Sequence, residues 1–278
     1  MIKVAMVNMK GGVAKTTLAV NVADYLSRMA KKRVLLVDLD PQFNATQCLF
    51  SPTDYAAAKA SGRHTITAVF DDSPHAAISP VTGAAASSAI PFSDIIPWHL
   101  KDRYDVLPGD LELYRLDMTP GQGREYRLKR YLEEYSKGKN IDFVIIDTPP
   151  TPSHWMMSGL LASDYYLVPV RPEPLSRTGI DLLRGVIGRC ATNYGHNIEC
   201  AGVVLTVTDR RTTVFDDALD VLSKDPFWKD KKFKADLPSR TKIAKAQGLQ
   251  QLILDTDVQD AKLALAQIAN ELISRTEK

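Results

Sequence analysis

The stretch MVNMKGGVAKTTLAVNVADYL, residues 6–26, sets the architecture expected for the rest of the chain, because it joins a strand to a helix through a glycine turn. Apolar residues 4–7 predict the strand, and the helix is predicted over residues 15–29. Backbone N–H groups of such a turn and of the following helix N-terminus converge on one point, which favours a bound phosphate. The sequence therefore predicts a phosphate-binding loop at the end of the first strand.

The loop carries the residue types that binding of a nucleoside triphosphate requires. Lys15 would reach the β- and γ-phosphates, and the Thr16 hydroxyl would complete a Mg²⁺ shell otherwise filled by water and phosphate oxygens. Thr17 can add a contact to the α-phosphate. The candidate nucleotide contacts in this stretch are Lys10, Gly11, Gly12, Val13, Ala14, Lys15, Thr16 and Thr17.

The loop departs from the ordinary phosphate-loop pattern in two ways. Met9 and Ala14 stand where glycine is usual, and Lys10 is an additional lysine. If position 14 needs a positive φ, alanine costs about 1 kcal/mol there by the left-handed penalty. We expect Ala14 to weaken nucleotide binding somewhat without abolishing it.

Composition limits the function classes without choosing one. The 278 residues are 45% hydrophobic, enough for a sizeable core, and 35 Lys and Arg against 33 Asp and Glu leave a formal charge of +2. Three cysteines without a CxxC pair fit a reducing compartment. No apolar run approaches the roughly 18 residues of a membrane span, and the N-terminal apolar run is too short for a signal peptide. We therefore expect a cytoplasmic protein.

Short apolar runs alternate with longer helical stretches, which predicts an α/β fold: a doubly wound, mostly parallel sheet flanked by helices. Further strands are predicted at residues 33–40, 142–150, 164–170 and 201–208. Helical spacing predicts helices over residues 124–138 and 259–275, with their apolar stripes in the core. We expect one domain over residues 1–278. An Ala-, Ser- and Pro-rich excursion at about 51–97 is expected to hold a short helix near 65–70 and then a mobile surface loop.

Three motifs in order, KGGVAKTT, LLVDLDPQFNAT and FVIIDTPP, resemble those of the ParA/MinD group of deviant phosphate-loop ATPases, and most closely the ParA branch that partitions DNA. The similarity runs through about residue 270 and is weakest over residues 51–97. It implies a Mg²⁺-dependent ATPase of phosphate-loop type. It also implies that Lys10 reaches across a dimer interface to the phosphates of the partner's ATP, so that ATP joins two subunits into a homodimer.

Carboxylates stand at the ends of the predicted strands, where open α/β sheets place their ligands. Asp38 and Asp40 alternate, so both would point the same way along one strand. By the resemblance, Asp40 orients or activates the attacking water, Asp38 supports the magnesium shell, and Asp147 is the Walker B acid that holds Mg²⁺ through water. The resemblance places adenine between two loops, with the candidate contacts Thr206, Asp209 and Pro238.

A basic window at residues 229–245 holds seven Lys and Arg against two Asp, a local charge of +5. Such a surface binds the phosphate backbone without reading sequence, although a solvated charged loop is the ordinary alternative. The segment PSRTKIAKA resembles the ParA segment that carries basic DNA contacts. On that match the candidates for DNA contact are Arg240, Lys242 and Lys245.

The resemblance implies a nucleoid-associated switch that binds non-specific DNA in its ATP state and is stimulated by a ParB-like, centromere-binding adaptor, with no membrane partner. With no room before Met1 for a helix-turn-helix domain, sequence-specific autorepression is not expected. Four alternatives stay open. They are a nucleoid-based ATPase that positions a protein cargo, a MinD-like membrane-cycling ATPase, an electron carrier like the nitrogenase iron protein, which needs paired cysteines, and a nucleotide-dead DNA-binding scaffold.

Overall fold

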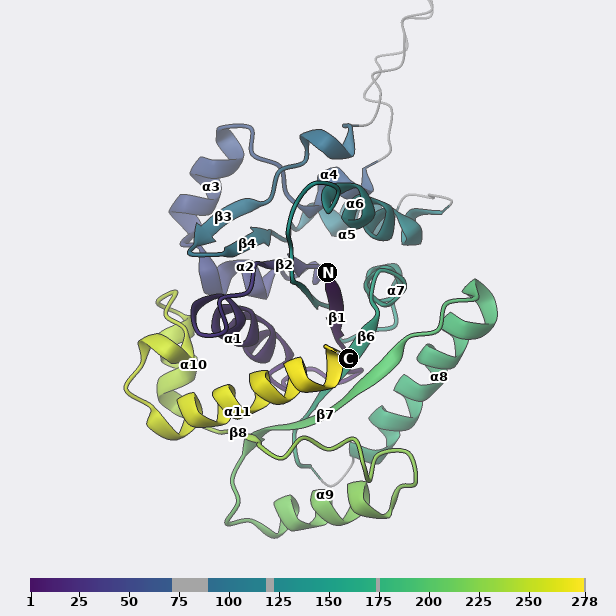
Figure 1. Cartoon of the computed structure of the whole chain (residues 1–278), viewed down its shortest axis with the longest axis vertical. Coiled ribbons are helices and arrows are strands. Elements are labelled where there is room, and N and C mark those ends of the chain that lie inside the picture. The colour runs from purple at the N-terminus through teal and green to yellow at the C-terminus, as the bar shows by residue number, and fades with distance from the viewer. Residues whose placement is uncertain (72–89, 119–122, 174–175, 278) are drawn as a thin grey trace, which may run out of the picture.

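Within residues 1–71, 90–118, 123–173 and 176–277, which this computed structural model describes, an eight-stranded sheet forms the centre of the molecule (Figure 1). The strand order is β3-β4-β2-β5-β1-β6-β7-β8, and every neighbouring pair is parallel except β3 with β4. This confirms the prediction of a doubly wound, mostly parallel sheet.

The strands are β1 (Ile2–Met6), β2 (Val34–Asp38), β3 (Trp98–Lys101), β4 (Tyr104–Leu107), β5 (Phe143–Asp147), β6 (Tyr165–Val170), β7 (Glu199–Thr208) and β8 (Leu237–Pro238). The five predicted strands are present, with ends shifted by a few residues. The sequence did not reveal β3, β4 and β8, because they are two to four residues long and β3 carries polar side chains. Strands that short give no apolar run.

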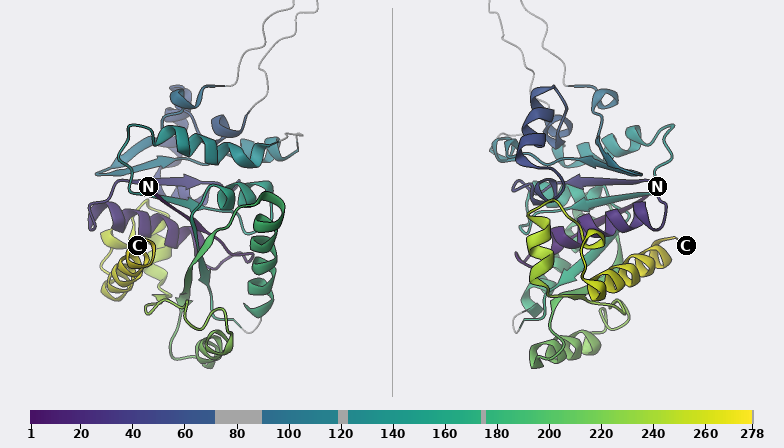
Figure 2. Two further views of the ribbon diagram at one scale, coloured as in Figure 1. Left: turned by 45° about the vertical axis from the view of Figure 1, so that its right-hand side comes forward. Right: turned by 90° about the vertical axis from the view of Figure 1, so that its left-hand side faces the viewer.

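The helices cover both faces of the sheet. In chain order they are α1 (Lys15–Arg28), α2 (Asn44–Leu49), α3 (Pro52–Ala60), α4 (Ile66–Phe70), α5 (Glu112–Asp117), α6 (Arg127–Tyr135), α7 (His154–Leu161), α8 (Ser176–Tyr194), α9 (Thr213–Lys224), α10 (Thr241–Gln247) and α11 (Gln259–Thr276). Figure 2 shows α1 and α11 on one side of the sheet and α7 and α8 on the other. The predicted helix over 124–138 begins with a 3₁₀ turn at Arg124–Tyr126 and continues as α6.

Alternate residues of the buried strands feed separate cores on the two faces. Val4 and Met6 of β1 pack with α1 and α11, whereas Ala5 packs with α7 and α8. A third cluster joins β2 and β5 to α4, α5 and α6. Because both faces are covered, β2 and β5 are buried along their whole length, as is usual for mostly apolar strands of a parallel sheet.

The excursion predicted at residues 51–97 contains α3 and α4, and α4 matches the short helix expected near 65–70. Most of the predicted mobile loop lies outside the described residues. In the part of the chain that is described, no helix has the length and apolar character needed to cross a membrane.

Gly202 lies in β7 at a shift in the register between β6 and β7, and it has φ +145. Substitution of this glycine tests the packing around it. A Cβ at this position would collide with the Lys231 carbonyl oxygen and lie 2.6 Å from Phe233 Cε2. We expect Gly202→Ala to lower the free energy of unfolding by about 3 kcal/mol through overpacking, measured by urea denaturation.

Gly185→Ala is the matched control, because Gly185 lies within α8 and an added Cβ there meets nothing within 4 Å. We expect this control to raise the free energy of unfolding by up to about 1 kcal/mol, since alanine favours helix. Equal effects of the two substitutions would contradict the close approach at Gly202.

Candidate functional site

The glycine loop between β1 and α1 has the backbone conformation of an anion cradle. Gly12 has φ +73, and Ala14, the residue before the helix, has φ +55 and ψ +33. Position 14 therefore does require the left-handed region that glycine would occupy without strain. No side chain caps the start of α1 and its first turn has no acid, so the N–H groups of this turn are left for an anion.

Side-chain hydrogen bonds connect the glycine loop and the end of β1 to the neighbouring strands of the sheet. Thr148 Oγ1 donates to the Met6 carbonyl at 2.7 Å, and Asn8 Nδ2 donates to the Pro169 carbonyl at 2.6 Å. Thr206 Oγ1 donates to the Val13 carbonyl at 2.8 Å, and the Thr206 side chain is fully buried. Thr206, predicted as an adenine contact, thus supports the loop and in this conformation presents no surface to a base.

The predicted magnesium ligands Thr16 and Asp147 lie together at the start of α1 and the end of β5. Thr16 Oγ1 donates to Asp147 Oδ2 at 2.7 Å, while Asp147 Oδ1 is buried with no hydrogen-bond partner. Burial raises the pKa of Asp147 to about 6, against the charge of Lys15 and the hydrogen bond from Thr16, which lower it. A hydroxyl beside an unsatisfied carboxylate oxygen is the donor set that Mg²⁺ prefers, so these residues fit the ion.

Asp38 is fully buried at the end of β2, directly beside Asp147 in the sheet register. It accepts from the Thr46 backbone N–H at 2.9 Å and from Thr46 Oγ1 at 2.7 Å. Burial and the neighbouring charge of Asp147 raise the pKa of Asp38 to about 8. Its contacts therefore tie α2 to the sheet. The support of the magnesium shell by Asp38 stays a prediction.

Asp40 lies beyond the end of β2, so the strand alternation that led us to expect Asp38 and Asp40 to point the same way does not apply. Asp40 is in a turn, where its carbonyl accepts from the Phe43 N–H at 2.7 Å and its Oδ1 accepts from the Gln42 N–H at 3.0 Å. Phe43 has φ +41, a strained value for an aromatic residue. The turn thus fixes the position of Asp40, which is almost fully buried.

Lys10 is half-exposed and forms an ion pair with Glu173, which follows β6. Glu173 also lies 3.2 Å from Arg171 Nε, and its hydrogen bond with Lys10 lowers the pKa of the Glu173 carboxyl. The second lysine of the loop is therefore held by an acid of its own chain. Sequence reasoning missed Glu173, because no motif connects it to a residue 163 positions earlier.

Thr17, the predicted α-phosphate contact, connects the loop to α10. Its Oγ1 donates to Gln247 Oε1 at 3.1 Å, and Gln247 Nε2 is buried without a hydrogen-bond partner. Gln247 is the last residue of α10, the helix that carries Lys242 and Lys245. The candidate nucleotide and DNA contacts are thus joined by one side-chain hydrogen bond.

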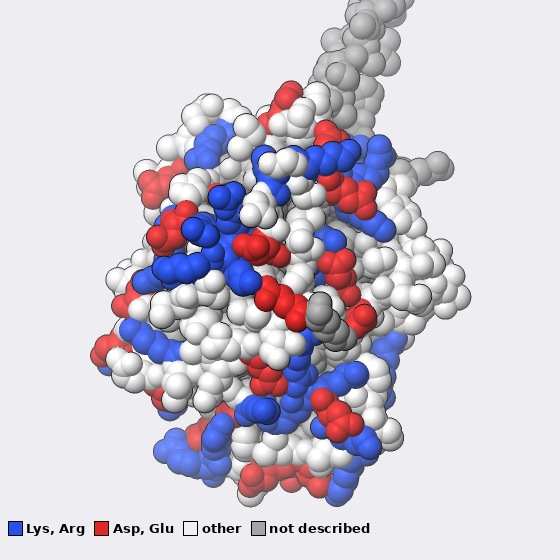
Figure 3. All heavy atoms as spheres, in the orientation of Figure 1, with Lys and Arg blue, Asp and Glu red and all other residues white. Residues whose placement is uncertain are grey.

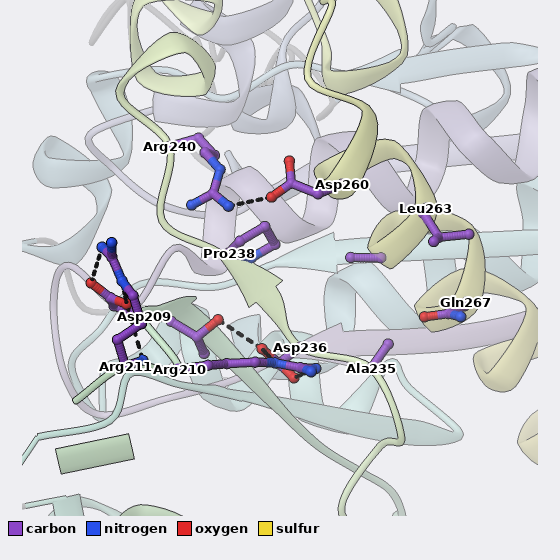
Figure 4. Close-up of a pocket in the computed structure, with 12 residues that line it drawn as sticks. Asp209, Arg210, Arg211, Ala235, Asp236, Pro238, Arg240, Asp260, Leu263 and Gln267 are labelled. Atoms are coloured by element: carbon purple, nitrogen blue, oxygen red, sulfur yellow. Dashed lines mark hydrogen bonds and ion pairs between the residues drawn. The ribbon is translucent and has the colours of Figure 1, made fainter. Parts of the chain in front are cut away.

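Two candidate adenine contacts and one candidate DNA contact line the same hollow of about 700 Å³ beside β8 (Figure 4). Asp209, Pro238 and Arg240 all line it, and Figure 4 shows Pro238 next to Arg240 and Asp209 beside Arg211. Asp209 accepts a bidentate hydrogen bond from Arg211, and this partner lowers the pKa of Asp209 to about 2. The sequence had placed these residues in two separate functions.

The basic window is less positive in space than in sequence. Arg240 pairs with Asp260, and Lys242 pairs with Asp257 at 2.7 Å; both acids lie outside the window. Lys245 is exposed and has no ion pair within the described residues. Figure 3 accordingly shows acidic and basic side chains interspersed over the face in view.

Comparison with known proteins places this geometry among partition proteins and their structural relatives. The family model described as an AAA domain matches residues 1–200. The chromosome partitioning protein ParA of Caulobacter vibrioides is 30% identical over 275 residues, which cover 98% of this chain and 93% of that protein.

Two solved structures share the fold. A putative plasmid partition protein of Borrelia burgdorferi bound to AMPPNP is 16% identical with a TM-score of 0.73, covering 99% of this chain and 97% of that one. The cobyrinic acid a,c-diamide synthase of Mycobacterium smegmatis with bound ATP analogue and magnesium is 26% identical with a TM-score of 0.72, covering 97% and 93%.

Ala14→Gly tests the left-handed conformation of the loop. Glycine removes the steric penalty, which outweighs its larger chain entropy, so we expect the free energy of unfolding to rise by about 0.5 kcal/mol. Ala57→Gly, at an exposed position inside α3, is the control and should lower it by about 1 kcal/mol. Urea denaturation measures both, and a loss at position 14 equal to that at position 57 would refute the assignment.

Asp38→Asn tests the buried carboxyl pair. The folded chain holds a proton on Asp38 up to about pH 8, whereas the unfolded chain releases it near the ordinary value of 3.8, so this group makes stability fall as pH rises between those values. The Asp38→Asn variant has no carboxyl at this position, so this fall in stability with rising pH is absent from it. We expect its stability relative to wild type to improve by on the order of 1–3 kcal/mol from pH 5 to pH 8.

The measurement is urea denaturation at several pH values in EDTA without nucleotide. Asp230→Asn, which changes an exposed carboxylate, is the control and should follow the wild-type pH profile. A parallel profile for Asp38→Asn would show that Asp38 is ionised in the folded chain.

Proposed function

Since this chain belongs to the ParA family of deviant Walker A partition ATPases, we propose that it is an ATP-dependent dimerising switch for plasmid or chromosome partition. In its ATP state the dimer binds DNA without sequence preference, and a ParB-like centromere-binding adaptor stimulates hydrolysis and release. The observation that carries the proposal is the placement of Lys10 at the surface beside the phosphate loop, held by Glu173 of its own chain.

The nucleotide-binding part of the proposal rests on the glycine loop between β1 and α1. The positive φ values at Gly12 and Ala14, together with the uncapped start of α1, support a cradle for the phosphates, with Lys15 at the first position of the helix. Thr16 and Asp147 would hold Mg²⁺, Asp147 through water, and the ion supplies charge neutralisation when bound. These contacts also argue against a nucleotide-dead scaffold, because Ala14 adopts the conformation that the loop needs.

Hydrolysis of the γ-phosphate needs a positioned water and neutralised charge. Asp40 would orient the water, and the turn through Gln42 and Phe43 supports this role because it holds the residue in place. Lys15 faces the phosphates from its own subunit. Lys10 of the partner subunit would complete the positive charge around the phosphates, so turnover depends on dimer formation.

Dimer formation requires Lys10 to leave Glu173. The pair is half-exposed, so separating it costs at most about 1 kcal/mol, which a doubly charged phosphate partner readily offsets. Arg171 remains beside Glu173 after Lys10 leaves, so the carboxylate keeps a cationic neighbour. A ligand shared between two chains favours the dimer in proportion to its preference for that state.

Coupling of nucleotide to DNA is proposed to run through Thr17 and Gln247. A phosphate that engages the Thr17 hydroxyl competes with Gln247 at the end of α10, where an amide N–H₂ is already unsatisfied. The same helix carries Lys242 and Lys245, and Arg240 precedes it. Dimerisation doubles this basic surface, which raises affinity for a continuous polyanion more than for single phosphates.

The test is a mobility shift of arbitrary duplex DNA at fixed low salt, with no nucleotide, with ADP, or with ATP and Mg²⁺. We expect wild type to bind only with ATP and Mg²⁺, and Lys10→Ala to lose binding by at least about tenfold because one charged phosphate contact is removed from each ATP. Sedimentation velocity under the same conditions should report a dimer for wild type and a monomer for the variant.

Lys137→Ala removes an exposed lysine at the end of α6 and is the matched control, expected to behave as wild type. DNA binding that ignores nucleotide would overturn the switch. Binding that needs ATP but survives Lys10→Ala would retain the ATP dependence and exclude the shared-nucleotide dimer.

A further inference from the structure

A hollow of about 400 Å³ lies at the opposite end of the sheet from the glycine loop. It is bordered by Arg33 before β2, by Arg103 before β4 and by Lys139 between α6 and β5, so it lies at the amino ends of these parallel strands. The glycine loop, Asp38 and Asp147 lie instead at the carboxyl ends of β1, β2 and β5. The hollow shares no residue with the candidate nucleotide and DNA contacts.

The three cations that border this hollow form no ion pair within the described part of the chain, although all three are exposed. Arg103 Nη1 donates to the Lys31 carbonyl at 2.8 Å, and Lys139 Nζ lies 3.6 Å from the centroid of the Tyr135 ring. Neither contact supplies a full negative charge. The Arg33 guanidinium has no hydrogen bond to any described residue. Three positive charges without a counter-ion thus line one opening.

The sheet brings two of these charges close together. Val34 is the register partner of Tyr104, and its N–H donates to the Arg103 carbonyl at 2.8 Å. Arg33 and Arg103 therefore stand one residue before the paired ends of two neighbouring strands, where like charges repel. Partial burial also lowers the pKa of Lys139, because it disfavours the charged form. An anion in the hollow would relieve the repulsion and stabilise the charged lysine.

Two aspartates at the same hollow limit the kind of anion that fits. Asp102 is exposed in the turn between β3 and β4, and Asp105 Oδ1 lies 2.9 Å from His99 Nδ1. Their charges oppose a continuous polyanion such as a nucleic-acid backbone, in which every unit adds a negative charge. Carboxylate oxygens are, however, good acceptors for hydroxyl groups. The hollow therefore favours a ligand with one anionic end and several hydroxyl groups.

We propose that this hollow binds a sugar phosphate, with the phosphate held by Arg33, Arg103 and Lys139 and the hydroxyl groups by Asp102 and Asp105. A phosphate monoester has three terminal oxygens and accepts from cations on three sides, whereas a carboxylate has two oxygens in one plane. The volume lies in the range of small-molecule pockets, about 300–1,000 Å³. The proposal does not rest on the proposed function, because none of these residues serves it.

The test is an amide NMR titration of the ¹⁵N-labelled full chain with glucose 6-phosphate, sulfate and glucose as separate probes. Phosphate bound at the glycine loop would move the Gly11 and Gly12 signals, whereas a ligand in the hollow would move those of Gly138 and Asn140, which line it. We expect glucose 6-phosphate to move the second pair saturably, with a Kd in the millimolar range. Sulfate should bind roughly threefold to tenfold more weakly, and glucose should cause no shift.

Arg33→Gln and Lys139→Gln each remove one of the three charges, and we expect each to weaken glucose 6-phosphate binding roughly threefold to tenfold. Arg33→Lys keeps the charge and should lose less than Arg33→Gln. Lys137→Gln removes an exposed lysine at the end of α6 that does not line the hollow, so it is the matched control and should behave as wild type. The same spectra show that each variant is folded.

Asp102→Gly tests the hydroxyl acceptor. Asp102 has φ +47, a value that glycine adopts without strain, so the turn should survive the substitution. We expect the variant to lose most of the preference for glucose 6-phosphate over sulfate, because an acceptor for hydroxyl groups and a charge that repels sulfate are removed together.

No saturable movement of the Gly138 and Asn140 signals with glucose 6-phosphate would overturn the proposal. Equal weakening by Lys137→Gln would also overturn it, because general screening of surface charge would then explain the binding. Equal affinity of wild type for sulfate and glucose 6-phosphate would show an anion site without selection for hydroxyl groups and would refute the ligand class. These outcomes leave the proposed function unaffected, because the glycine-loop signals are read separately.

Discussion

Two carboxylates, Asp38 and Asp147, are fully buried side by side at the carboxyl ends of β2 and β5, and the arrangement of the site follows from what this burial requires. Adjacent buried carboxylates repel, and each is costly unless a proton, a cation or a hydrogen bond compensates it. Asp38 is satisfied by Thr46 and by a raised pKa. Asp147 is satisfied on one oxygen only, by Thr16 at the start of α1, so the other oxygen is left buried without a hydrogen-bond partner.

The hydrogen bonds that stabilise the buried Asp38 carboxylate also connect it to the turn that bears Asp40. Thr46 bonds Asp38 and also accepts the Gly109 N–H at 2.8 Å, which draws the end of β4 against the same carboxylate. A Cβ on Gly109 would lie 2.9 Å from Asp38 Cγ and 2.7 Å from Phe43 Cβ, so only glycine allows this approach. Phe43 also closes the turn around Asp40, so the Asp38 carboxylate, Gly109 and the turn that holds Asp40 are packed against one another.

The sequence predicted those residues of the candidate site that follow an apolar run. The loop around Lys15 and the acids Asp40 and Asp147 were predicted in this way, because each apolar run indicates a strand. The supports could not be found, since Thr148 and Thr206 bond the loop region across 142 and 193 residues and no spacing rule spans such distances. For the same reason charge counting overestimated the basic window, as Asp257 and Asp260 lie outside it in sequence but beside it in space.

The cations assigned to nucleotide and DNA binding share one physical property, which is that the single subunit already pairs most of them with its own acids. Lys10, Lys242 and Arg240 are each held by an exposed or half-exposed carboxylate. Such pairs contribute about 0–1 kcal/mol, so they keep the subunit from binding stray anions but yield to a phosphate held by several contacts at once. Strong buried pairs would resist the ligand. In the switch proposed above, weak internal pairing would therefore give the range in which a coupling of 1–3 kcal/mol between nucleotide and DNA is enough for control.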